Sequence, residues 1–216
     1  MDFYVDDLDG PPKFWTDIGL HADMMTPLAH HHIPATSYYV LFDRSTEHGH
    51  PNQPPYLALQ IRRSQESFTY EARRLPLPSM AQSWLIHRGC PAEAISLRTD
   101  LGPEPGNQET VALERRLVSD GDHFAMGYCF TRADPSDPFT VVALRALDDR
   151  PVPYRVLVEE IDYKTWTYTL REIGCESVGD ALRRCEDRIL GRAKSSGRSS
   201  PVSAQPLTGQ PSRRLR

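Results

Sequence analysis

Alternation of apolar and polar residues predicts most of the strands in this chain. The segment SYYVLFD at 37–43 is rich in aromatic and β-branched residues, and FTVVALRAL at 139–147 is apolar on both faces, as in a central strand. Two pairs of alternating segments, each separated by a short connection, predict hairpins. The expected strands are 37–43, 56–63, 67–74, 123–132, 139–147, 154–161 and 165–172.

Two serines mark the expected starts of helices that follow the hairpins. Ser79 has Gln82 three residues later, which is the pattern of a capping box, and Gly89 is suited to end this helix. Ser177 has Asp180 at the same spacing. The helix after Ser177 is expected to pack through one apolar face, made of Val178, Ala181, Leu182, Cys185 and Ile189.

Other segments give weaker signals. Residues 11–30 predict one short helix, whereas HHHIPA at 30–35 and the Pro-rich segment 45–55 are expected to be loops. Residues 109–119 fit a helix or a strand equally well. The turn-forming residues SDGD that follow them favour a hairpin.

The two hairpin–helix segments match each other when the sequence is shifted by 98 positions. The identical pairs predict a duplicated β-β-β-α unit, and the alternative is that unrelated segments share the residues common to strands and helix caps. The predicted fold class is α+β, an antiparallel sheet with a few helices, in two related β-β-β-α halves that could share one sheet. The identical pairs are Tyr56/Tyr154, Leu59/Leu157, Thr69/Thr167, Tyr70/Tyr168, Arg73/Arg171 and Ser79/Ser177.

This reading divides the chain into four parts. Residues 1–36 form an acidic, His-rich segment with a short helix, 37–100 the first β-β-β-α half, and 101–190 a second β-rich half that ends in a helix. Residues 191–216 contain six basic residues, no acidic ones, and many Ser, Pro, Gly and Gln, so they are expected to be a disordered basic tail.

Charge limits the partners that the folded part can bind. The formal net charge is −4, from 25 basic and 29 acidic residues, and removing the six basic residues of the tail leaves 19 − 29 = −10 for the rest. An acidic body is poorly suited to wrapping duplex DNA. The tail is expected to be solvated, or to make a weak electrostatic contact with nucleic acid or an acidic partner. Arg supplies 22 of the basic residues, which suggests a GC-rich, bacterial genome.

The sequence also favours a cytoplasmic location. No apolar run approaches the roughly 20 residues that a membrane helix needs, and the acidic start MDFYVDDLDG is unlike a signal peptide. The cysteines form no C-x-x-C pair and are expected to be reduced, partly buried thiols at Cys90, Cys129, Cys175 and Cys185.

Motifs for catalysis are missing from the sequence. It contains no G-x-S-x-G elbow, no phosphate-binding glycine loop and no H-E-x-x-H, so no catalytic residue and no cofactor are expected. The acidic pairs Glu159–Glu160 and Asp148–Asp149 are expected to be solvated. Six of eight histidines lie in the first 50 residues, and His48 and His50 are weak candidates for a metal site.

The open face of the predicted sheet carries the candidate binding residues. Each helix is expected to cover Phe68 and Tyr70, or Trp166 and Tyr168, and to leave the opposite face free. A three-stranded sheet backed by a helix resembles in outline the small N-terminal modules of tyrosine integrases, which lay their open sheet face into a DNA groove. The candidates on that face are Gln60, Arg62, Thr69, Arg73, Thr167, Thr169 and Arg171.

These observations favour a non-catalytic cytosolic interaction or regulatory protein, whose partner is expected to be a protein. One alternative is a nucleic-acid-binding accessory protein that uses the open sheet face and the basic tail. A second alternative is a metal-dependent enzyme that uses the N-terminal His cluster.

Overall fold

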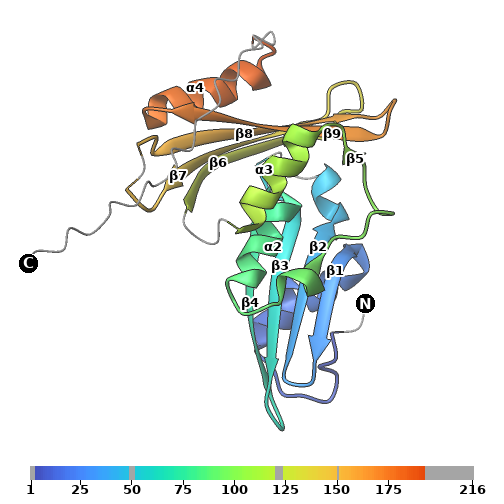
Figure 1. Cartoon of the computed structure of the whole chain (residues 1–216). Coiled ribbons are helices and arrows are strands. Elements are labelled where there is room, and N and C mark those ends of the chain that lie inside the picture. Colours follow the sequence, from blue (N-terminus) through green and yellow to red (C-terminus); the bar gives the residue numbers. More distant parts are fainter. Residues whose placement is uncertain (1–2, 49–51, 120–123, 150, 193–216) are drawn as a thin grey trace, which may run out of the picture.

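A computed structural model describes residues 3–48, 52–119, 124–149 and 151–192. The expected basic tail therefore lies almost entirely outside the described residues. The strands form two separate sheets, with helices α2 (Pro78–Ile86) and α3 (Gln108–Ser119) between them in Figure 1.

The first sheet is an antiparallel meander. Its strands lie in chain order, because each strand pairs with the one before it. A short helix, α1 (Pro12–Asp17), precedes the sheet, and α2 follows it. The strands are β1 (Met25–Ile33), β2 (Thr36–Asp43), β3 (Tyr56–Arg63) and β4 (Phe68–Leu75).

The second sheet repeats this order and adds one short strand at an edge. Its four long strands also form an antiparallel meander, followed by α4 (Val178–Ile189), and the two-residue β5 (Glu104–Pro105) pairs in parallel with the last of them. The long strands are β6 (Phe124–Arg132), β7 (Phe139–Ala146), β8 (Tyr154–Asp162) and β9 (Thr167–Cys175).

The α+β fold class is therefore confirmed, with two differences in detail. The halves have one sheet each and do not share one, and the first meander has four long strands where three were predicted. The unpredicted strand of the first sheet is β1, which includes the histidines expected in a loop. Its backbone pairs with β2, a predicted strand, from Met25 to Ile33, with a bulge between Pro27 and Ala29. Pairing with a neighbour thus overrides a weak local pattern.

The segment 109–119 is a helix, so the hairpin favoured by the sequence is wrong. The Asn107 side-chain oxygen accepts a hydrogen bond from the Thr110 backbone N–H at 2.8 Å, which satisfies a donor of the first turn. Leu113 and Leu117 are buried one turn apart. Packing of these two leucines in the core selects the helix.

The two predicted helix caps have different outcomes. Ser177 accepts a hydrogen bond from the Asp180 N–H at 3.1 Å, as expected. Ser79 does not cap α2, because Pro78 already lies in the helix and Leu77 is the cap residue. The Gln82 side chain donates instead to the Ile95 carbonyl at 2.9 Å. Gly89 has φ +91° just after α2, in agreement with its predicted role in ending the helix.

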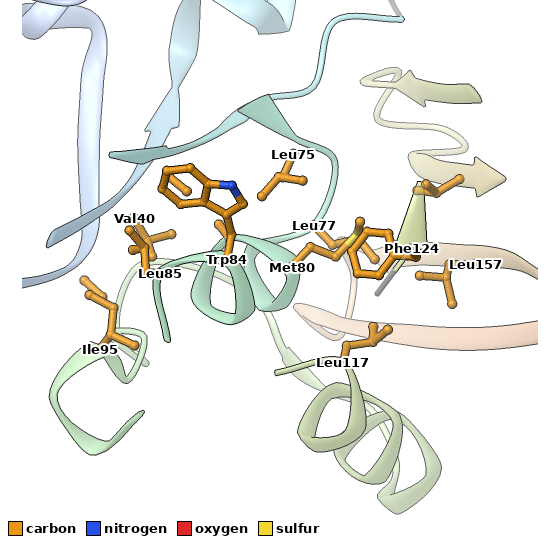
Figure 2. Close-up of a cluster of buried hydrophobic side chains, with 14 of the residues drawn as sticks. Val40, Leu75, Leu77, Met80, Trp84, Leu85, Ile95, Leu117, Phe124 and Leu157 are labelled. Carbon is orange, nitrogen blue, oxygen red and sulfur yellow. The ribbon is translucent and has the colours of Figure 1, made fainter. Parts of the chain in front are cut away.

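The largest hydrophobic cluster joins the two halves. It contains residues of both sheets together with α2 and α3, and Figure 2 shows Trp84 of α2 beside Val40, with Met80 reaching towards Phe124 and Leu157 of the second sheet. Helix α2 is buried along most of its length. The core that holds the molecule together is therefore also the interface between the halves.

The other faces of the sheets are also covered. Phe68 and Tyr70 pack edge-to-face on Phe14 of α1, at ring-centroid distances of 4.9 and 5.2 Å. The prediction that they lie beneath α2 is therefore wrong. On the far side of the second sheet, Ala181 and Cys185 of α4 are buried, whereas the other members of its predicted apolar face are at least partly exposed: Val178, Leu182 and Ile189.

The four cysteines are free and buried, in agreement with the prediction of reduced thiols. Among the described residues, no helix is long and apolar enough to cross a membrane.

Candidate functional site

The predicted binding residues of the first half share the face that α2 covers. Gln60 is buried and donates to the Arg88 carbonyl at 3.1 Å, so its side chain faces the interior. Arg62 forms an ion pair with Glu71 at 3.0 Å. Thr69 is exposed, and Arg73 is half-buried. The expectation that Arg73 lies opposite the helix is wrong, because it pairs with Ala58 of the α2-facing cluster.

The predicted residues of the second half lie in the other sheet, on the face beneath α4. Thr167 and Thr169 of β9 are half-buried and Arg171 is exposed. Arg171 pairs with Val158, which packs under α4, and its guanidinium donates to Glu160 at 2.5 Å. The structure does not combine the two predicted sets into one surface.

The histidines are divided between two segments. His30 and His31 of β1 stack on Tyr39 and Tyr38, and His32 lies 2.7 Å from the Ser37 hydroxyl. His48 ends the 3-10 turn Arg44–His48, and His50 lies outside the described residues. In the described ranges no three His, Cys, Asp or Glu side chains gather as a metal site requires.

A group of buried and half-buried acids and tyrosines lies where the halves meet, and sequence reasoning missed it. Glu159 of β8 is only 9% exposed, so the expectation that it is solvated is wrong. Its cross-strand neighbour is Thr140, which hydrogen-bonds to it. The Tyr168 hydroxyl donates to Glu114 of α3 at 2.5 Å. We call the following residues the acidic cluster: Tyr56, Glu114, Glu159 and Tyr168.

The pKa values of all four members of the acidic cluster are raised. Burial, reinforced by the nearby charge of Glu114, raises the pKa of Glu159 to about 7. Burial also raises the pKa of Glu114, although the Tyr168 hydrogen bond opposes this. The pKa values of Tyr56 and Tyr168 are raised mainly by burial. Within the described residues, neither acid of the cluster forms an ion pair with Lys or Arg.

A cavity of about 550 Å³ opens beside Glu159. It lies between the end of the first sheet and strands β6 to β8 of the second, and Tyr56 and Thr140 also line it. Four more aromatic side chains line it, Phe42, Phe130, Phe139 and Tyr163, together with polar, charged and aliphatic residues.

Tyr163 connects this cavity to an exposed aromatic pair. Tyr163 and Trp166 lie in the turn between β8 and β9 and stack with ring centroids 5.8 Å apart. Trp166 is 51% exposed, so the prediction of a core residue is wrong. Its φ is +53°, in the left-handed region that favours Gly or Asn. Its carbonyl accepts a hydrogen bond from the Glu104 N–H at 3.0 Å, which helps to hold this conformation.

One sequence signal could have located Glu159. In YRVLVEEI apolar residues occur on both faces of the strand, as in a strand that is buried on both sides. Glu159 shares its face with Leu157, which is fully buried. An acid in register with a core leucine is a candidate for burial. Nothing in the local sequence indicates its neighbours, because Tyr56 and Glu114 come from distant elements.

Glu159 should make the stability of the protein fall as the pH rises. Because its folded-state pKa is about 7 and its usual value is 4.5, the contribution of this proton to stability is complete below about pH 4.5 and is lost as the pH rises through 7. Glu159→Gln should therefore raise the free energy of unfolding by about 3 kcal/mol at pH 8 and by much less at pH 5. Urea denaturation at both pH values measures this. The exposed Glu109→Gln is the control, and parallel pH profiles for wild type and Glu159→Gln would contradict the assignment.

No family model matches the sequence, and neither curated proteins nor solved structures include a significant match to the chain.

Proposed function

We propose that this chain is a non-catalytic, cytosolic interaction or regulatory protein that contacts a partner protein through the β8–β9 turn. The observation that carries this proposal is the exposure of Trp166. This large apolar side chain lies in solvent, and its backbone has a left-handed conformation that is unfavourable for tryptophan. Strained conformations of this kind concentrate at functional sites. Tryptophan and tyrosine are also the residues most enriched at interface hot spots.

The turn is ordered in a way that suits binding. The Asp162 carboxylate accepts a hydrogen bond from the Lys164 N–H at 2.8 Å, and the Thr165 and Thr167 hydroxyls lie 2.8 Å apart. The stacked Tyr163 further restricts the indole. An aromatic anchor that is ordered before binding loses less conformational entropy when the complex forms.

We also propose that the two halves arose by duplication of one sheet-plus-helix module. Each half has four antiparallel strands followed by a helix, and the first strand pair of each contains a bulge, between Pro27 and Ala29 and between Met126 and Tyr128. These features support the proposal beyond the identities at an offset of 98.

Trp166→Gly should abolish partner capture without unfolding the protein. Glycine at φ +53° relieves a strain of about 1–2 kcal/mol, which offsets the lost stacking on Tyr163, so the melting temperature should change little or rise. Affinity capture with quantitative mass spectrometry, using the full chain as bait, should then show a partner that wild type enriches and the variant does not.

The matched control is Leu147→Ser, which removes another exposed apolar side chain and should retain the partner. A Trp166→Gly variant that folds normally and captures the same proteins as wild type would overturn the proposed surface.

A further inference from the structure

The cavity beside Glu159 contains a buried carboxyl group with an incomplete set of partners. Glu159 is more than nine-tenths buried and lines the cavity, and its hydrogen bond comes from the neutral hydroxyl of Thr140. The other acid of the acidic cluster, Glu114, is engaged by the neutral hydroxyl of Tyr168. A buried carboxylate is normally compensated by a cation, and the described part of the chain supplies none to either acid.

The arginine that lines this cavity is already committed elsewhere. Arg132 donates to Asp137 at 2.8 Å and to the Ile189 carbonyl at 2.7 Å, and its guanidinium lies 4.7 Å from the centroid of Phe139. Its charge is therefore shared between a carboxylate, a carbonyl and an aromatic ring. This leaves Glu159 available to a cation that comes from outside.

The aromatic side chains of the wall suit an organic cation. Phe42 and Tyr56 form a tilted pair with centroids 5.6 Å apart, and Phe130 and Tyr163 also face the cavity. Aromatic faces attract ammonium groups and accommodate the alkyl groups attached to them. The volume of about 550 Å³ is far larger than a metal ion needs and lies within the usual range for small-molecule sites.

We propose that this cavity binds a small alkylammonium ion, with its charge beside Glu159 and its alkyl groups against the aromatic side chains of the wall. An anion is disfavoured by the buried Glu159 and the nearby, half-buried Glu114, and a neutral ligand leaves Glu159 without a cation. The inference does not depend on the proposed partner surface. The two sites share Tyr163, and their other side chains differ.

The site should bind more tightly as the pH rises. A cation interacts with the ionised form of Glu159, whose pKa of about 7 means that ionisation increases between pH 6 and pH 8. The groups that act on this carboxyl are Glu114 from α3, Tyr56 from β3, Tyr168 from β9 and Thr140 from β7. The cavity wall adds the charged side chains of Arg132 and Asp134. A simple alkylamine stays protonated throughout this range, so the titration would belong to the protein.

Calorimetric titration of the full chain tests this inference with n-butylamine, choline and tetramethylammonium as probes, and with n-butanol and butyrate as neutral and anionic controls. At pH 8 at least one of the three cations should bind saturably, and the two controls should not. The affinity of that cation should fall about tenfold or more in Glu159→Gln, and also in wild type at pH 5.5. In Glu159→Gln the pH dependence should disappear.

Glu109→Gln is the matched control and should keep the wild-type affinity, because Glu109 is exposed at the start of α3. Glu159→Gln is expected to be more stable than wild type at pH 8, so a loss of binding in this variant cannot be attributed to unfolding. The inference is overturned if none of the three cations binds, if a cation binds Glu159→Gln as tightly as wild type, or if butanol or butyrate binds equally well.

Discussion

Replacing Asp43 by alanine should lower the free energy of unfolding by about 3–5 kcal/mol, because it leaves the partly buried cation Arg74 without its counter-ion. Asp43 ends β2, and its side chain is only 2% exposed. One carboxylate oxygen accepts from Arg74 at 2.6 Å, and the other accepts from the Ser45 N–H and hydroxyl at 3.0 and 2.6 Å. The Asp43 carboxylate therefore connects Arg74 of β4 to Ser45 in the turn that follows β2.

The effect should depend on pH in a defined direction. Burial raises the pKa of Asp43, but the hydrogen bonds from Ser45 and Arg74 outweigh it and hold the pKa below its usual value. The ionised carboxylate therefore stabilises the fold above about pH 4, and this contribution is lost as the pH falls through the lowered pKa. The deficit of Asp43→Ala should be complete at pH 7 and should shrink below pH 4.

Urea denaturation of wild type and Asp43→Ala at pH 7 and pH 3.5 measures both effects. Asp100→Ala is the matched control, because Asp100 also pairs with an arginine, Arg98 at 2.7 Å, but on the surface. Exposed pairs contribute little, so this variant should keep the wild-type midpoint. Equal midpoints for the two variants would show that the Asp43–Arg74 pair does not stabilise the fold.

Alternation predicted the strands wherever a strand has one or two apolar faces. It located β2, β3, β4 and the long strands of the second sheet. It failed for β1, where Pro27, a bulge and three histidines hide the pattern, and where pairing with β2 supplies the missing information. It also failed for α3, because only packing of Leu113 and Leu117 in the core separates helix from strand there.

Side-chain alternation shows which residues share a face but not which element covers that face. The sequence correctly groups Phe68 with Tyr70, yet α1 covers them and α2 does not. The covering residue, Phe14, is far away in the chain, so the local pattern around the strand does not indicate it. The same limit applies to the candidate sites. Glu159 is buried by elements of the other half and by α3, whereas Trp166, a residue typical of cores, is exposed by a turn whose left-handed φ no sequence pattern indicated.

Trp84→Ala should be as destabilising as Asp43→Ala, at about 3–5 kcal/mol. The indole is buried in the cluster that joins the halves, and Figure 2 shows it against Val40 and Leu85. The Arg88 guanidinium covers one face of the ring at 3.6 Å from its centroid. Alanine would leave a cavity on α2 and remove this cation–π contact.

Because the cluster contains residues of both sheets, the loss should reach both halves together. Hydrogen exchange can follow amides of β3 and β8 separately, and both sets should lose the same protection in Trp84→Ala. Leu182→Ala on the exposed side of α4 is the control and should change neither set by much. If Trp84→Ala weakens protection in β3 while β8 keeps its wild-type protection, the halves unfold independently and the shared core does not couple them.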